Sequence, residues 1–145
     1  TGVQWATLNV DATSIQNGNS NVTAASNSNV TVQTGGSACA TFDTSQNLTV
    51  VGTVTAQSAM ALKDNIETIP DALARVLNLR GVEWDYKSNG THNIGVVAEE
   101  IEQEFPCLVH TDNAGIKSVA YQNIVGVLIE AIKDLKLEID QLKKG

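Results

Sequence analysis

The chain has 145 residues and a formal net charge of -7, and its charges are unevenly distributed. All nine Lys and Arg residues lie at or after Lys63, whereas residues 1–62 carry only Asp11 and Asp43 as formal charges. No cluster of basic residues is available to displace the counterions of a phosphate backbone, and no apolar run reaches the roughly 18 residues of a membrane-spanning helix. We therefore expect neither nucleic acid nor a membrane as partner. The length suits one ordinary domain, or a small domain joined to a repetitive segment.

Residues 1–57 form a polar segment rich in Asn, Ser, Thr, Val and Gly. The tetrapeptide Ser-Asn-Val-Thr occurs at residues 20–23 and again at residues 28–31, which is a repeat of period eight. Short Val/Thr runs such as residues 30–32 and 48–51, separated by Asn, Gly and Ser, are typical of short strands and turns. The sequence predicts an all-β repeat segment over residues 1–57.

This β-rich segment offers few large side chains other than Trp5 and Phe42. One copy can therefore hardly bury enough apolar area to offset the conformational entropy of its chain. We expect the segment to fold only with partner chains, and otherwise to stay disordered.

A helix is predicted from Ile69 to Leu79. Thr68 has the position of an N-cap, and Pro70 suits the first turn because its missing N–H is not needed there. Gly81 supplies a stop signal after the apolar face ends.

A β-hairpin and then a second α/β stretch follow. Apolar and charged residues alternate over residues 82–87, Asn89-Gly90 is a strong turn signal, and residues 94–97 give the second strand. A short acidic helix is predicted from Ala98 to about Glu104. Two further strands, Cys107–His110 and Ile116–Tyr121, then flank a turn at residues 112–115.

Two groups of potential ligands are given no chemistry. The acidic helix concentrates carboxylates that suit a cation, but a solvated helix face is the favoured interpretation. Cys39 and Cys107 have no metal-binding spacing, and we interpret them as small buried or half-buried thiols. We expect no metal and no cofactor. The carboxylates concerned are those of Glu99, Glu100, Glu102 and Glu104.

The final helix, predicted over residues 121–144, carries the clearest periodicity in the chain. Its apolar residues repeat every seven positions and interleave as heptad a and d positions. Two interpretations are open: the helix packs onto its own domain, or it forms a coiled coil with copies of itself, which we favour. β-branched residues at a with Leu at d would by themselves favour a dimer. The a residues are Val125, Ile132 and Ile139, and the d residues are Leu128, Leu135 and Leu142.

The string Ser-Ala-Met-Ala-Leu-Lys-Asp-Asn-Ile at residues 58–66 resembles the entry motif of a known family. The family is the C-terminal intramolecular chaperone domain of bacteriophage tail spikes, tail fibres and endosialidases. The resemblance continues in order to about Lys144, through Gly81-Val82, residues 94–102, Phe105-Pro106, Leu108-Val109, Val119-Ala120-Tyr121 and the heptad helix.

The resemblance implies a homotrimer, which replaces the dimer. It implies an α+β chaperone module over residues 58–145 that ends in a coiled-coil helix. This module would hold three chains in register while an intertwined β-fibre folds, and would then be released by self-cleavage at Gln57-Ser58.

Carried over from the family by position, Ser58 is the nucleophile of this cleavage and Lys63 is the general base. A lysine can act as a base only if its pKa falls from about 10.4 toward neutrality. The two residues are five apart, so a turn has to bring them together.

Ala59 departs from the family, which usually has Asp after the serine. An Asp could orient Ser58, stabilise a protonated Lys63 or accept backbone N–H groups at the turn, and Ala can do none of these. We expect self-cleavage to be slow or absent in this chain. His92 is a possible auxiliary residue, although a polar residue beside a turn is the plainer interpretation.

Several functions from different classes stay open. The alternatives to a self-cleaving chaperone are a non-catalytic trimeric cap and a host-binding fibre tip. The tip would need aromatic platforms that this sequence scarcely offers. A membrane-bound transcription factor with the same module is disfavoured because the segment ahead of it has no basic DNA-binding character.

We expect the partners to be further copies of the chain and the fibre or spike domains upstream of the module. The expected location is a tail fibre or spike precursor assembled in the bacterial cytoplasm.

Overall fold

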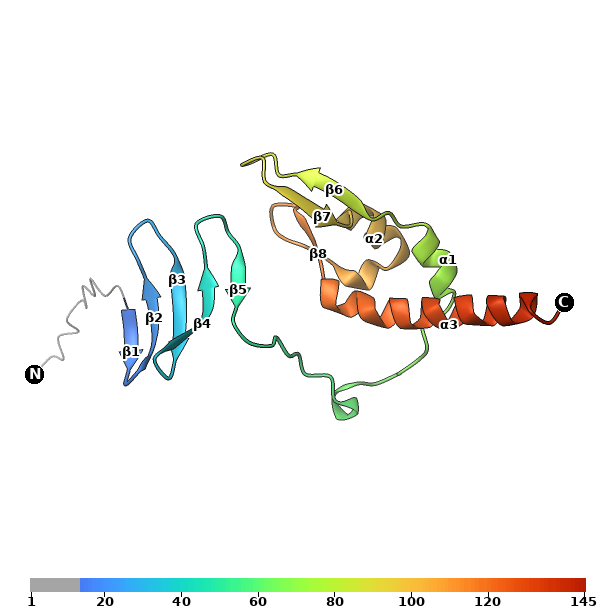
Figure 1. The fold of residues 1–145 in the computed structure, drawn as a ribbon, viewed down its shortest axis with the longest axis horizontal. Coiled ribbons are helices and arrows are strands. Elements are labelled where there is room, and N and C mark those ends of the chain that lie inside the picture. Colours follow the sequence, from blue (N-terminus) through green and yellow to red (C-terminus); the bar gives the residue numbers. More distant parts are fainter. Residues whose placement is uncertain (1–13) are drawn as a thin grey trace, which may run out of the picture. The chain divides into compact units, whose positions relative to one another are not determined.

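The structure is a computed structural model that describes residues 14–145, and the chain divides into two compact units, residues 1–62 and 63–145 (Figure 1). Trp5 lies outside the described residues. Each unit is considered by itself below.

The first unit is a five-stranded antiparallel sheet whose strands follow one another in chain order (Figure 1). This arrangement confirms the strands predicted near residues 30–32 and 48–51. The strands are β1 (Ser14–Asn17), β2 (Ser20–Ala24), β3 (Val30–Thr34), β4 (Ser37–Phe42) and β5 (Leu48–Val50).

Glycine and aspartate set the tight connections between these strands. Gly18 after β1 has a φ of 61°, and Gly35 and Gly36 between β3 and β4 have φ values of 59° and 83°. Such left-handed conformations are those that two-residue hairpin turns require. In the β4–β5 loop, one carboxylate oxygen of Asp43 accepts the backbone N–H groups of Ser45 and Asn47, both at 2.9 Å. The Asn47 side chain, which also donates to this carboxylate, lowers the pKa of Asp43.

The register gives the sheet one apolar and one polar face. Val22 pairs with Ile15 and Val32, and Ala40 pairs with Val32 and Val50, so an apolar row crosses all five strands. Because side chains alternate along a strand, Thr23, Thr31, Thr41 and Thr49 form a row on the opposite face. The period-eight repeat therefore places its two valines, Val22 and Val30, on the same face.

No side chain in the described part of this unit is fully buried. Ile15 is 80% exposed, and Leu48, which pairs with Phe42 on the apolar face, is 55% exposed. The sheet is a single layer whose apolar face is uncovered within its own unit.

The second unit packs three helices and two small antiparallel hairpins around a small core. Ile101, Phe105, Leu108 and Val127 are buried together, and half-buried residues such as Val76 and Val96 surround them. The helices are α1 (Ala72–Leu77), α2 (Ala98–Glu104) and α3 (Ile124–Leu142). The strand pairs are β6 (Val82–Asp85) with β7 (His92–Gly95) and β8 (Val109–Thr111) with β9 (Lys117–Val119). Three short 3-10 turns are η1 (Met60–Leu62, in the first unit), η2 (Pro106–Leu108) and η3 (Tyr121–Asn123).

Helix α1 is shorter than predicted. It begins at Ala72, after Asp71 in a left-handed conformation with a φ of 52°, so the prediction of Thr68 as N-cap was wrong. Pro70 disfavours helical geometry at Ile69, which keeps the preceding residues extended. The helix ends at Leu77 with Asn78 as its C-cap, four residues before the predicted stop at Gly81.

Most other local predictions hold with small shifts. Strand β8 begins at Val109 and not at the predicted Cys107, because residues 106–108 form the turn η2, and α3 begins at Ile124, after the turn η3. Helix α2 has the predicted bounds, and Asp112 closes the predicted turn by accepting the N–H groups of Ala114 and Ile116 at 2.8 and 2.9 Å. The hairpin β6–β7 is confirmed, although its second strand begins at His92 instead of Ile94. Its connection is a six-residue loop, in which Gly90 has a φ of 69°. Among residues 14–145, no helix combines the length and apolar composition needed to cross a membrane.

Candidate assembly surface and processing segment

Helix α3 uses one face to pack onto its own unit. Val127 and Ala131 are buried, and Ile124 and Asp134 on the same face are half-buried. Asp134 also accepts the backbone N–H of Leu73 at 3.2 Å, so a carboxylate of α3 caps the start of α1. The interpretation that this helix packs onto its own domain therefore applies to this face.

The heptad residues lie on a different face, which we call the heptad stripe. All six of its residues are exposed, from 38% at Ile139 to 82% at Leu142. Figure 1 shows the other elements of the unit gathered along the first part of α3, with its C-terminal end extending beyond α1. The stripe is left uncovered by its own unit, and its pairing in a coiled coil remains a prediction. Its members are Val125, Leu128, Ile132, Leu135, Ile139 and Leu142.

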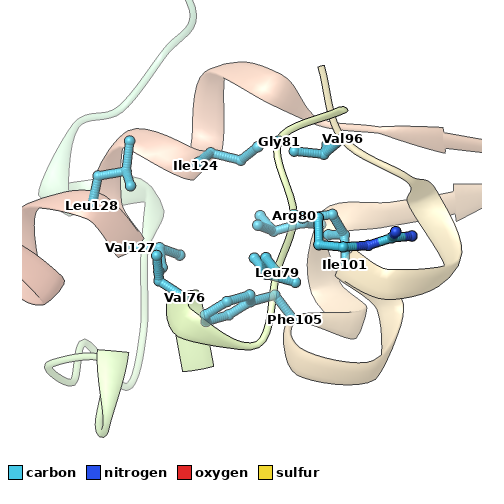
Figure 2. Close-up of a pocket in the computed structure, with 11 residues that line it drawn as sticks. Val76, Leu79, Arg80, Gly81, Val96, Ile101, Phe105, Ile124, Val127 and Leu128 are labelled. Carbon is cyan, nitrogen blue, oxygen red and sulfur yellow. The ribbon is translucent and has the colours of Figure 1, made fainter. Parts of the chain in front are cut away.

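An apolar cavity of about 280 Å³ opens beside the stripe. Leu128 belongs to both, because it is a d residue of the stripe and lines the cavity. Figure 2 shows the lining side chains, which come mainly from the three helices and the segment after α1. No separate sequence signal marks this cavity, since its lining residues have the same periodicity as the core.

The predicted cleavage site lies in an exposed irregular segment. Residues 53–59 have no regular secondary structure, and Gln57, Ser58 and Ala59 are all exposed. The 3-10 turn η1 follows at once, and its Leu62 N–H donates to the Ala59 carbonyl at 3.1 Å. A peptide bond in such a segment is accessible to attack.

A turn separates Ser58 from Lys63, as their spacing requires. Lys63 is exposed and is the first residue of the second unit, whereas Ser58 belongs to the first. The roles of Ser58 as nucleophile and Lys63 as base remain predictions. Ala59 immediately precedes η1, which is the place where an Asp side chain could accept an unpaired N–H of the turn.

His92 is an exposed residue of strand β7 and contacts two carboxylates of the neighbouring strand β6. Its Nδ1 is 2.9 Å from Asp85 Oδ1, and its Nε2 is 3.8 Å from Glu83 Oε2. All three side chains are more than 60% exposed. The geometry fits a polar surface residue of the hairpin, and an auxiliary role in cleavage remains untested.

The carboxylates of α2 are mostly paired with side chains of other elements, so their interpretation as a solvated face was wrong for three of the four. Arg80 binds Glu100, Lys117 binds Glu102, and Asn78 donates to Glu104 at 2.9 Å, with Arg75 nearby. Arg80 lowers the pKa of Glu100 through its hydrogen bond to the carboxylate. These pairs fasten α2 to α1, to the segment after α1 and to β9.

The remaining potential ligands do not gather into a site. Within residues 14–145, no three His, Cys, Asp or Glu side chains are placed to hold a metal ion. Cys39 is half-buried as predicted and donates to the Val32 carbonyl at 3.2 Å. Cys107 is exposed in η2, because it precedes the residue that points into the core, so its prediction as a buried or half-buried thiol was wrong.

Residues 58–110 match the Peptidase_S74 family, described as the chaperone of endosialidase. The match confirms the resemblance that begins at Ser58, and it indicates a chaperone role in the folding of phage tail proteins. The family name indicates a peptidase. A comparison with curated proteins finds no match.

The matched residues cover somewhat more than a third of the chain. They begin at the predicted cleavage site and end in β8, so β9 and α3 with its heptad stripe lie beyond them. The family match therefore does not reach the proposed assembly surface, which is inferred from the exposed apolar residues of α3 alone.

Proposed function

We propose that the module after Gln57 is a trimerising chaperone that brings three copies of the β-rich segment together so that they can fold. The observation that carries the proposal is the heptad stripe, which is exposed although another face of the same helix packs onto the unit. A helix needs only one apolar face to pack onto its own domain. A second, exposed apolar face therefore indicates that another molecule covers it.

The energetics favour further copies of the chain as that partner. Only six apolar residues are buried among those that the structure describes, which is a small core for a chain of this length. Fully burying a Leu or Ile side chain contributes about 1.5–3 kcal/mol. Burying the six stripe residues against neighbouring copies would therefore add several kcal/mol per chain, which is comparable to the whole free energy of unfolding of a small domain.

The single-layer sheet explains why such assembly aids folding. Its apolar face has no cover within its own unit, and its strands carry no charge that would oppose the approach of a second sheet. Chains joined through α3 meet at a high effective concentration, so the entropy cost of bringing three sheets together falls. The proposed setting is the assembly of a tail fibre or spike precursor in the bacterial cytoplasm.

The assembly is tested by light scattering of the intact chain and of a Leu128→Ala/Leu135→Ala variant. The intact chain should have the mass of a trimer, and the variant should dissociate at concentrations where the intact chain does not. Leu137→Ala is the matched control, because Leu137 is a 61% exposed leucine of the same helix that lies off the stripe. A monomeric intact chain would overturn the proposal.

We propose further that the module carries a latent self-cleavage step. The Ser58 hydroxyl attacks the Gln57 carbonyl carbon and gives its proton to Lys63, and the bond to the Ser58 nitrogen breaks as this nitrogen takes the proton from Lys63. Water then hydrolyses the resulting ester, which leaves a Gln57 carboxylate and a free Ser58 hydroxyl. The exposed irregular segment at Gln57-Ser58 and the turn between Ser58 and Lys63 support this step. Ala59 lacks the carboxylate that the family usually has directly after the serine, and we therefore expect the step to be slow or absent.

Mass spectrometry of the purified chain over days tests the cleavage. Ala59→Asp should yield a fragment that begins at Ser58, and adding Ser58→Ala to that variant should abolish the fragment. If Ala59→Asp stays intact while the chain is still trimeric, the module is a non-catalytic cap. A Ser58 fragment accumulating within hours in the unaltered chain would show that Ala59 does not impair the reaction.

A further inference from the structure

We infer that an ion pair between Glu138 of one copy and Lys143 of the next joins the α3 helices of neighbouring copies, which the proposed in-register trimer places in parallel. The inference rests on the proposed assembly through the heptad stripe. It adds the charged residues that neighbouring helices use at the edge of the stripe.

The heptad positions identify the two residues. With Ile132 and Ile139 at a positions, Glu138 takes the g position. Lys143, the C-cap of α3, keeps right-handed helical angles and takes the e position five residues later. In a parallel, in-register coiled coil, a g residue of one helix lies beside the following e residue of its neighbour. Glu138 and Lys143 thus meet as opposite charges at the edge of the stripe.

The intrachain contacts leave these two side chains available. Lys133 pairs with Glu130 at 2.6 Å, and Lys136 pairs with Asp140, so both of these lysines are engaged along their own helix. Within the described chain, neither Glu138 nor Lys143 takes part in an ion pair, and both are exposed. They are also beyond the part of α3 that packs onto the unit.

The first half of the helix cannot select the orientation. Its g residues are Ile124 and Ala131, which pack toward the unit's own core, and its e residue is Ile129. The selection therefore falls on the C-terminal turns. In an antiparallel pair with the two helices fully overlapped, e residues face e residues and g residues face g residues, so Lys136 lies beside Ile129 of its neighbour and Glu138 beside Ala131. Neither charge then meets an opposite charge, so the pair between Glu138 and Lys143 forms only in the parallel orientation.

Crosslinking of the full chain tests the orientation. In a Cys39→Ser/Cys107→Ser background, Leu142→Cys chains treated with a short bismaleimide should become linked to one another through their new thiols. In an antiparallel pair, residue 142 would instead lie near residue 125 of its neighbour, about 25 Å away along the helix. Links that form only between Leu142→Cys and Val125→Cys chains would overturn the inference while leaving the assembly intact. A monomer in light scattering would remove the assembly itself.

Charge exchange tests the two residues without altering the stripe. Glu138→Lys alone and Lys143→Glu alone should each weaken association, by about two- to fivefold for each pair lost. The double variant Glu138→Lys/Lys143→Glu should recover the original association. An equimolar mixture of the two single variants should recover only part of it, because a trimer made of two kinds of chain keeps one like-charged contact. Lys144→Glu is the control, because Lys144 lies at an f position away from the stripe. Equal losses in the single and double variants would overturn the assignment of this pair.

Discussion

Gly95 at the end of β7 lies beneath two aromatic side chains. A Cβ atom at this position would come within 2.6 Å of Tyr121 Oη and 2.9 Å of the Trp84 ring. Gly95→Ala should therefore destabilise the unit by about 1–3 kcal/mol, because the half-buried Trp84 ring would have to shift to admit the added methyl group. Denaturant unfolding measures the change.

A matched glycine separates the close contact from a general effect of alanine. Gly81 has open space around its Cβ position and no left-handed φ, so Gly81→Ala should be nearly neutral. Combining Gly95→Ala with Tyr121→Phe, which removes the nearest atom, should recover part of the loss. Equal stabilities for Gly95→Ala and Gly81→Ala would contradict the close packing.

The ion pair between Arg80 and Glu100 predicts a dependence of stability on pH. Arg80 lowers the pKa of Glu100 below its usual value, so the pair stabilises the folded chain above the unfolded pKa of about 4.3. This contribution is lost as the pH falls through the lowered folded pKa. The unfolding free energies of the intact chain and Arg80→Met should therefore differ at pH 7 and converge in acid. A difference that grows on acidification would contradict the pairing.

At the scale of elements, α1 depends on a cap that is remote in the chain. Asp134 of α3 accepts the Leu73 N–H at 3.2 Å, and the N-cap residue Asp71 makes no capping hydrogen bond with its side chain. Asp134→Ala should cost about 0.5–2 kcal/mol, as the loss of an N-cap does, whereas Asp134→Asn should keep an acceptor and most of the stability. Thermal unfolding of both variants checks this, and equal losses for Ala and Asn would show that the acceptor is unimportant.

This cap shows where sequence patterns succeed and where they fail. The α2 bounds and the Asp112 turn were predictable because their signals lie within a few residues of one another. Thr68 had the local pattern of a cap, but the actual acceptor is contributed by α3, 61 residues after Leu73. The ion pairs of Glu100 and Glu102 were missed for the same reason, since their partners come from other elements.

For the molecule as a whole, heptad periodicity predicted which residues of α3 would stay exposed, but it could not predict that a second face holds the domain. The family motifs located Ser58 and Lys63, yet a motif carries no distance between two side chains that are separated by a turn. The apolar face of the sheet was also hidden from single-strand patterns, because it depends on the register that aligns Val22, Val32 and Ala40.

That sheet face allows the chaperone role to be measured apart from oligomer mass. The row from Ile15 to Val50 is uncovered within its own unit, so the sheet should be protected from hydrogen exchange only while neighbouring copies cover it. Leu128→Ala/Leu135→Ala should therefore raise amide exchange in β2, β3 and β4, although both substitutions lie in the other unit. Leu137→Ala should leave exchange in these strands unchanged, because it removes an exposed leucine off the stripe. Unchanged protection of the strands in a dissociated double variant would mean that the sheet folds without the assembly, and the module would then join chains without acting as their chaperone.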